Sequence, residues 1–297
     1  REERWQKDRD LFVKNVTDAG GFVDVQTANL DADVQYQQAE NLIAKGIKTF
    51  VVVPYDGEKA AAIVELAHKN GAKVLSYDRL IKGSPVDFYV SFDNEKVGEL
   101  EANGVLSKIK SGNIAYIGGA PTDNNSTLLK KGSHSVIDPL VQSGAIKLVV
   151  DEFTEDWRPE NAYLTIKKYL QTGKTLDGVI AANDGTAGGA IRALKEVGLA
   201  GKIPVSGQDA ELAACQRIIA GTQTLTVYKP ISAIAKKAAE IAIHMAEGVD
   251  PVSNSTVENG AYTTTSYLIE PIAVDKSNID KTIIKDGYHA REQIYGK

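Results

Sequence analysis

Short apolar runs along the chain alternate with stretches in which apolar residues recur every three or four positions. The first pattern predicts β-strands and the second predicts amphipathic helices. The predicted strands are FVDVQTA (22–28), TFVVVPY (49–55), KVLSYD (73–78), VDFYVSF (86–92), NIAYIGG (113–119), IKLVVDEF (146–153), GVIAAND (178–184), IPVSGQDA (203–210), TLTVY (224–228) and TSYLIEPIAV (265–274). The predicted helices cover residues 3–18, 34–46, 57–71, 93 to about 110, 126–142, 159–172, 186–197 and 230–247. This alternation predicts an α/β fold with parallel sheets covered by helices.

Two stretches of the chain follow one plan. Residues 22–79 and residues 146–209 each predict strand, helix, a strand ending in Asp-Gly, helix, and a strand ending in Asp. The motif VVVPYDG of the first stretch corresponds to GVIAANDG of the second, and VLSYDR corresponds to PVSGQDA. A chain of 297 residues is long enough for two domains. The repeat therefore predicts two α/β lobes of related topology.

Composition excludes several classes of protein. The net charge of −5 comes from mixed charges, which argues against a nucleic-acid-binding surface. No apolar run approaches the length of a membrane span, and the N-terminal REERWQKDRD lacks the apolar core of a signal peptide, so the sequence reads as cytosolic or as a processed form. The one cysteine, Cys215, lies at helical spacing among apolar residues and is predicted to be a core thiol. The four histidines show no metal-ligand spacing, so no metal and no cofactor is predicted.

Polar side chains gather where the predicted strands end, and ligands of open α/β sheets bind at the carboxyl ends of strands. These residues are Asp56, Asp78, Arg79, Asp123, Asn124, Asn125, Asn183, Asp184, Gln208, Asp209 and Lys229. Helix capping is the competing explanation, and it suits Asp56, Asp93 and Asp184 well. Capping explains Arg79, Asn183 and Lys229 less well, so we expect a polar ligand site.

Two tryptophans add an aromatic component to this site. Trp5 lies in ERWQKDRD, where core packing on its own helix is an open alternative. Trp157 lies in the charged loop TEDWRPEN, which is not typical of a core position. Aromatic rings can cover the apolar faces of a pyranose, while carboxylates, amides and cations hydrogen-bond its hydroxyls. The residues therefore predict a sugar site.

The motifs ERWQKDRD, VLSYDR, SFDNEKVGEL, PTDNN, NDGTAGGAIRAL, SGQDAEL and GTQTLTVYKP resemble the ribose/galactose-type periplasmic binding proteins of bacterial ABC transporters, from residue 1 to about 290. The resemblance implies a type I periplasmic-binding-protein fold, with two Rossmann-like lobes and three crossovers at the hinge, near residues 91–94, 226–229 and 262–266. The N-terminal lobe is expected to comprise 1–91 plus 228–262, and the C-terminal lobe 92–227 plus 263–297. Family members carry a strand of about ten residues before the segment that contains Arg4, so the placement of Arg4 and Trp5 is an open question.

The resemblance also implies the contact residues of the ligand, motif by motif. The implied ligand-binding residues are Arg4, Trp5, Lys7, Asp78, Arg79, Asn125, Trp157, Asn183, Asp209 and Lys229. The implied ligand is a monosaccharide, D-xylose, and the implied role is not enzymatic. The protein would be a monomer in the periplasm or on the outer face of a membrane, either free or held by a lipid. Its partner would be an ABC permease, or alternatively a membrane sensor kinase that reads the closed form.

Two other classes of protein are weighed against this one. The effector domain of a transcriptional repressor shares the fold, but it would need a helix-turn-helix segment, and none is found. A sugar-processing enzyme could use Asp78 and Asp209 as a carboxylate pair. The neighbouring Arg79 and Lys229 should instead lower the pKa of such acids, which suits hydrogen bonding better than proton donation.

Overall fold

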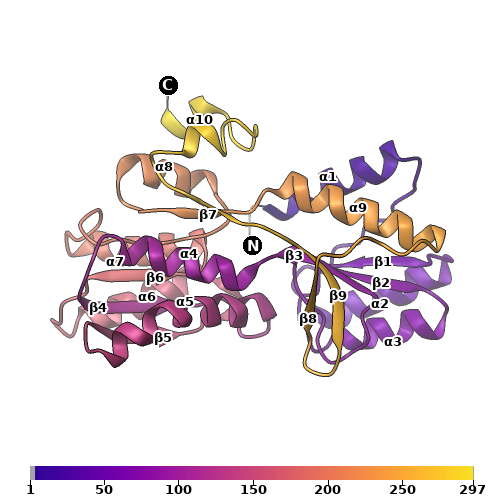
Figure 1. The fold of residues 1–297 in the computed structure, drawn as a ribbon, viewed down its shortest axis with the longest axis horizontal. Helices are drawn as coiled ribbons and strands as arrows, with labels where there is room; N and C mark the ends of the chain where they lie inside the picture. The colour runs from indigo at the N-terminus through magenta and orange to yellow at the C-terminus, as the bar shows by residue number, and fades with distance from the viewer. Residues whose placement is uncertain (1–3, 297) are drawn as a thin grey trace.

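The computed structural model describes residues 4–296. The chain folds into two lobes that lie side by side (Figure 1). The first lobe is built on a five-stranded sheet in the order β1-β2-β3-β9-β8, and the second on a three-stranded sheet in the order β5-β4-β6. The first sheet contains β1 (Thr49–Val52), β2 (Lys73–Tyr77), β3 (Phe88–Phe92), β8 (Ser255–Glu258) and β9 (Thr263–Ile269). The second contains β4 (Gly112–Ile117), β5 (Ile146–Glu152) and β6 (Gly178–Ala181). All pairings in these two sheets are parallel except that of β8 with β9.

Helices cover both sheets, as the alternating pattern predicted. In the first lobe α1 packs on α9 and α2 packs on α3; in the second, α4 packs on α5 and α6 on α7. The helices of the first lobe are α1 (Arg4–Asp18), α2 (Ala32–Ala44), α3 (Ala61–Lys69) and α9 (Ile231–Glu247). Those of the second are α4 (Asn94–Leu106), α5 (Asn124–Gln142), α6 (Pro159–Leu170) and α7 (Asp184–Glu196). The helices α4 and α5 meet closely at Gly98, where an added Cβ would lie 2.0 Å from the carbonyl oxygen of Leu129.

The C-terminal part of the chain completes the second lobe. A two-stranded antiparallel sheet pairs β7 (Thr226–Tyr228) with β10 (Ile272–Val274), and α10 (Arg291–Tyr295) packs on α8 (Leu212–Ala220). The short helices η1 (Glu155–Trp157) and η2 (Ile279–Lys281) lie in the connecting segments. Cys215 is buried in the apolar cluster between α8 and this C-terminal segment, which confirms the prediction of a core thiol.

The chain passes between the lobes three times. Two passages lie where the sequence predicted them, between β3 and α4 and between β7 and α9. The third follows β9, because β9 is parallel to β3 in the first-lobe sheet and β10 pairs with β7 in the second lobe. The predicted crossover at 262–266 and the predicted start of a second-lobe segment at 263 are therefore too early, and residues 1–3 and 297 of the predicted lobes lie outside the described residues. The predicted single strand 265–274 is divided at Glu270-Pro271, since proline cannot donate to a strand ladder.

Two further predicted strands are wrong. The segment FVDVQTA (22–28) forms no strand, and its Phe22 side chain is 82% exposed. Within the described residues β1 pairs only with β2, so this segment has no neighbouring strand to receive its backbone hydrogen bonds. The segment 203–210 makes only isolated bridges, at Val205 and Gln208. The first segment lacks a partner strand, whereas the second has partners in β6 and β7 but bridges each of them at a single residue.

Candidate functional site

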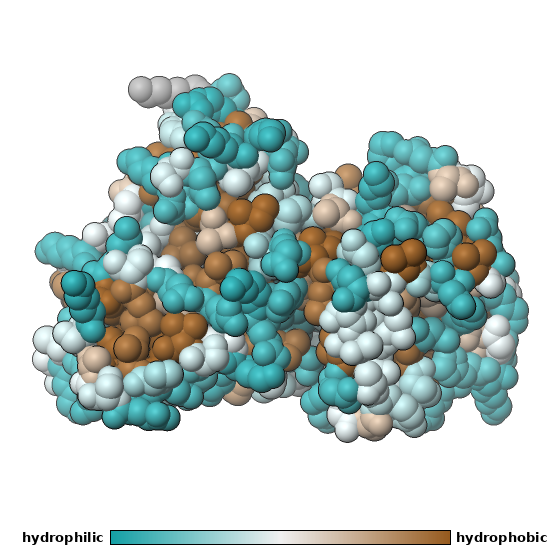
Figure 2. Space-filling view, viewed as in Figure 1, coloured by the Kyte–Doolittle hydropathy of each residue, from teal (hydrophilic) through white to brown (hydrophobic). Residues whose placement is uncertain are grey.

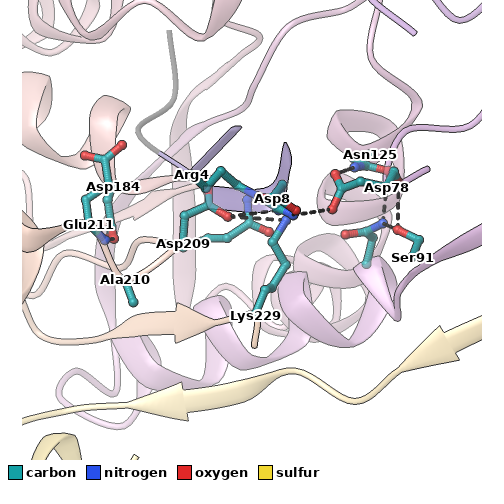
Figure 3. A network of polar contacts seen from close by, with 12 residues as sticks. Arg4, Asp8, Asp78, Ser91, Asn125, Asp184, Asp209, Ala210, Glu211 and Lys229 are labelled. Atoms are coloured by element: carbon teal, nitrogen blue, oxygen red, sulfur yellow. Dashed lines mark hydrogen bonds and ion pairs between the residues drawn. The ribbon is translucent and has the colours of Figure 1, made fainter. Parts of the chain in front are cut away.

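A buried arginine joins acidic side chains from both lobes. Arg4, in the first turn of α1, is only 3% exposed. Its guanidinium donates to Asp8 at 3.1 and 3.0 Å, and lies 3.0 Å from Asp78 and 3.6 Å from Asp209. Asp78 belongs to the first lobe and Asp209 to the second, so this one side chain bridges the two (Figure 3). We call Arg4, Asp8, Asp78, Asn125, Asp209 and Lys229 the inter-lobe polar cluster.

Asp78 occupies a constrained position immediately after β2. Its φ of 60° lies in the left-handed region, which is unfavourable for a residue with a side chain. Neighbouring β3 supports this conformation, because the hydroxyls of Tyr89 and Ser91 donate to the Asp78 carbonyl oxygen at 2.8 and 2.7 Å. The side-chain amide of Asn125, from the second lobe, donates to Asp78 Oδ1 at 3.1 Å. The carboxylate is therefore fixed from both sides of the inter-lobe junction.

Asp209 is the corresponding carboxylate of the second lobe. Its φ is 91°, and its carboxylate lies 3.3 Å from the ammonium of Lys229, which follows β7. Both side chains are buried, so neither charge is satisfied by bulk water. The sequence predicted that Arg4, Asp78, Asn125, Asp209 and Lys229 would meet, and the structure brings them together.

A second group of contacts centres on Asp123, the N-cap residue of α5. Its Oδ2 lies 2.9 Å from Nε of Arg79 and accepts from the indole Nε1 of Trp157 at 3.2 Å. Arg79 comes from the first lobe, so this pair is a second ionic contact across the junction. The Arg79 guanidinium also lies 5.3 Å from the centre of the Trp5 ring, within the range of a cation–π contact. Both predicted tryptophans therefore adjoin the polar side chains of the site.

Trp157 differs in one respect from its sequence interpretation. The loop pattern argued against a core position, but the ring is only 7% exposed and packs in an apolar cluster of the second lobe. Gly119 makes this possible, since an added Cβ there would lie 2.1 Å from the ring. Trp157 is therefore a buried ring with its N–H edge directed to Asp123, and both facts fit a ring that is held rigidly in place.

Two predicted site residues lie apart from the cluster. Lys7 donates to the backbone carbonyl of Tyr288 at 3.2 Å, and its ammonium lies 4.2 Å from the Tyr288 ring centre. Asn183 caps α7, accepting from the backbone and side chain of Thr186 at 2.8 Å. Capping therefore explains Asn183, where the sequence favoured a ligand contact. It explains Asp93 as predicted, since Asp93 accepts from Lys96 N.

Asp184 is neither a cap nor a member of the cluster. It is fully buried and accepts from Gln223 Nε2, Thr226 Oγ1 and the backbone of Glu211, at 2.7 to 2.9 Å. Figure 3 shows it apart from Arg4 and Asp78. Its repeat counterpart Asp56 only accepts from two successive backbone N–H groups, of Glu58 and Lys59, beside α3. The structural acid of the second lobe thus has no equivalent in the first.

Sequence reasoning missed Asp8. This carboxylate is 3% exposed, is held by Arg4, and accepts from the Tyr77 hydroxyl at 2.5 Å. A signal was available, because Arg4 and Asp8 are four residues apart on a predicted helix and must face the same side. Burial of Asp8 could not be read from that spacing.

The charges of the cluster determine which groups are ionised. Burial would raise the pKa of Asp78, but Arg4, Lys229 and Arg79 oppose it and hold the pKa below its usual value. Burial would lower the pKa of Arg4, but Asp78 and Asp8 raise it well above the ordinary range. Burial raises the pKa of Asp8, although Arg4 partly offsets the effect. Asp78 is therefore an ionised hydrogen-bond acceptor at neutral pH, which suits ligand hydroxyls and not proton donation.

Other kinds of site find no support in the part of the chain that the structure describes. Residues 4–296 contain no group of three or more His, Cys, Asp or Glu side chains placed to hold a metal ion. No described helix has both the length and the apolar character needed to cross a membrane. Figure 2 shows a largely polar surface on this face, with an apolar patch on the second lobe at lower left, away from the junction.

Comparison with known proteins decides the family. The family described as "Periplasmic binding protein domain" matches residues 2–250. The chain belongs to the periplasmic binding protein family. It is 49% identical to the D-xylose-binding periplasmic protein of Haemophilus influenzae, over 99% of this chain and 89% of that protein. It is 47% identical to the protein of the same name from Escherichia coli, over 98% of this chain and 89% of the relative.

A solved structure extends the comparison to the fold. The ABC transporter solute-binding protein of Clostridium phytofermentans, solved with bound β-D-glucose, superimposes with a TM-score of 0.91 at 29% identity, over 98% of this chain and 96% of that one. This confirms the predicted type I fold with two parallel-sheet lobes. The relatives are binding proteins, so the prediction that this periplasmic binding protein is not an enzyme is also confirmed.

Proposed function

We propose that this protein is an extracytoplasmic receptor that captures D-xylose between its lobes and delivers it to an ABC transporter. The observation that carries the proposal is the buried Arg4, which lies between strand-end carboxylates of opposite lobes, Asp78 and Asp209. The names of the two relatives support D-xylose as the ligand. The proposed location of this protein is the periplasm, and its proposed partner is an ABC permease. A membrane sensor kinase is the alternative partner.

The side chains at the junction suit a sugar for a physical reason. Each hydroxyl of a monosaccharide both donates and accepts, so a site that buries it must offer both kinds of partner. Asp78 and Asp209 accept, Arg4 and Lys229 donate, and Asn125 can do both. The indole rings of Trp5 and Trp157 would cover the apolar C–H faces of the sugar ring.

Closure of the lobes gives the proposed mechanism. A sugar bound to one lobe alone satisfies half of the polar groups, and closure brings the rest. The sugar shifts the equilibrium toward the closed form because it contacts both lobes only there. Lys7 and Asn183 make their observed contacts elsewhere, and they remain in the proposed set of contact residues with the others. The proposed set is Arg4, Trp5, Lys7, Asp78, Arg79, Asn125, Trp157, Asn183, Asp209 and Lys229.

A thermal-shift screen against pentoses and hexoses tests the proposal, because a ligand of the native state raises the melting temperature. D-xylose should give the largest shift, and calorimetry should give one-to-one binding with Kd of about micromolar or tighter, as several charged hydrogen bonds would provide. The C2 and C4 epimers of xylose are matched controls. A larger shift with ribose or glucose would contradict D-xylose while leaving a sugar receptor; turnover of any xyloside would contradict a binding role.

A further inference from the structure

A contact outside the inter-lobe polar cluster also joins the two lobes. The segment between β1 and α3 reaches the second lobe, where the Tyr55 hydroxyl donates to Asp156 Oδ1 at 3.0 Å. Two residues later, Gly57 N donates to the carbonyl oxygen of Thr122 at 3.3 Å. Thr122 immediately precedes Asp123, and Asp156 immediately precedes Trp157. This edge of the first lobe therefore contacts the residues next to the predicted stacking ring and its hydrogen-bond acceptor.

Asp156 holds two partners at once. Its Oδ1 accepts from Tyr55 of the opposite lobe, while its Oδ2 accepts from Arg158 of its own lobe at 2.9 Å. Arg158 is largely exposed and stays on its own lobe. Opening of the lobes would break the contact with Tyr55 and leave the contact with Arg158 intact. Of these two contacts, that with Tyr55 alone depends on lobe position.

The backbone connects Asp156 rigidly to Trp157. Asp156 has φ 52° and ψ 24°, and Trp157 has φ 56°, so two successive residues with side chains occupy the left-handed region. Such a conformation persists only where surrounding contacts impose it. Asp156 is held by Tyr55 and Arg158, and Trp157 by Asp123 and the space above Gly119. A change in the contacts of the Asp156 carboxylate should therefore shift the Trp157 ring.

We infer that Tyr55 is a positioning residue for ligand retention: its hydrogen bond to Asp156 forms on closure, stabilises the closed form and fixes Trp157 against the bound sugar. This inference rests on the proposed function. A contact made only in the closed form lowers the free energy of that form and leaves the open form unchanged. It should therefore slow sugar release and leave the rate of capture almost unaltered, since capture takes place in the open form.

Stopped-flow tryptophan fluorescence with D-xylose tests this inference on the full chain. Tyr55→Phe removes the hydroxyl and keeps the ring, and it should speed dissociation by about tenfold while changing association by less than about twofold. Tyr163→Phe is the matched control, because the Tyr163 hydroxyl donates to Glu196 at 2.7 Å within the second lobe. This control should leave both rates unchanged.

Changes at Asp156 separate positioning from general damage. Asp156→Ala should reproduce the faster dissociation, and the double variant with Tyr55→Phe should be no faster than Asp156→Ala alone, because both changes remove the same inter-lobe contact. Asp156→Asn keeps an acceptor oxygen for Tyr55 and should restore much of the slow dissociation. Additive effects in the double variant, or unchanged dissociation in Tyr55→Phe, would overturn the inference alone. A wild-type protein that does not bind D-xylose would overturn the proposed function and this inference together.

Discussion

The two strand-end aspartates, Asp78 in the first lobe and Asp209 in the second, have the same backbone arrangement and different supports. Each has a positive φ, each donates its N–H to a neighbouring strand, and the carbonyl of each accepts from a tyrosine hydroxyl. For Asp78 that tyrosine is Tyr89 of the adjacent strand, at 2.8 Å. For Asp209 it is Tyr288 of the C-terminal segment, at 3.3 Å.

This difference shows how a repeated motif acquires two roles. Asp78 is fixed by the sheet of its own lobe and lies 3.0 Å from Arg4. Asp209 is held less closely, lies 3.6 Å from Arg4, and shares its charge with Lys229. We interpret Asp78 as the fixed half of the site and Asp209 as the half that arrives on closure. The predictions below test this comparison, beginning with the largest expected effect.

Removing the two carboxylates one at a time is the most direct test. Asp78→Ala leaves the charge of the buried Arg4 less well compensated and should cost about 3–5 kcal/mol of folding free energy. It should also abolish sugar binding. Asp209→Ala should cost about 1–3 kcal/mol, because the contact is longer and Arg4 keeps Asp8 and Asp78. Urea denaturation and calorimetry measure the two quantities. Equal losses of stability would show that the lobes hold their aspartates alike.

The other repeated pair of acids, Asp184 and Asp56, should differ in the opposite sense, with the larger loss of stability in the second lobe. Asp184→Ala removes a buried carboxylate with three donors and should destabilise the protein by about 2–4 kcal/mol. Asp56→Ala removes only a turn contact and should cost about 1 kcal/mol or less. Thermal denaturation of both variants checks this. A large effect at Asp56 would mean that the first lobe depends on its copy as well.

The ring of Trp157 should matter more to the ligand than its N–H group does. Trp157→Ala should weaken sugar binding by about 1–3 kcal/mol, as loss of an aromatic anchor does. Trp157→Phe keeps a ring and loses the hydrogen bond to Asp123, so it should weaken binding by less. Calorimetric titration gives both values. If both variants bind as the wild type does, Trp157 serves the second-lobe core alone.

Glu101 of α4 provides a pH-dependent test of the second lobe. Its carboxyl is fully buried and neither oxygen has a hydrogen-bond partner among the described residues. Burial raises its pKa well above the ordinary value, and the nearby carboxylates of Asp184 and Asp209 raise it further. The folded protein therefore takes up a proton that the unfolded chain releases above its normal pKa. The stability that this proton provides is complete below the unfolded pKa and is lost as the pH rises toward the folded pKa.

Glu101→Gln removes this titration and keeps the shape. The stability of the variant relative to wild type should therefore rise by about 1.4 kcal/mol per pH unit above pH 5, until the folded pKa is passed. Melting temperatures at pH 5, 6, 7 and 8 measure the effect, which should be smallest at pH 5. A constant difference between the two proteins at all four values would contradict a protonated Glu101.

Local patterns identified most elements of this protein and failed where pairing decides. Period-two alternation in FVDVQTA predicted a strand, but extended backbone becomes a strand only beside another strand. The same limit applies to Asn183, because an amide side chain can cap a helix or hydrogen-bond a ligand equally well. Asp8 was missed because a helical i, i+4 spacing shows which face a residue shares, and not whether that face is buried.

By itself the sequence determined the alternating α/β order, the repeated strand-end aspartates and the family, because these depend on local periodicity and on residue identity. Only the tertiary structure decided that Asp78 and Asp209 share Arg4, that β9 belongs to the first lobe, and that Trp157 is buried on Gly119. Each of these depends on which distant segments are brought together, and burial and charge pairing acquire energetic meaning only after that has happened.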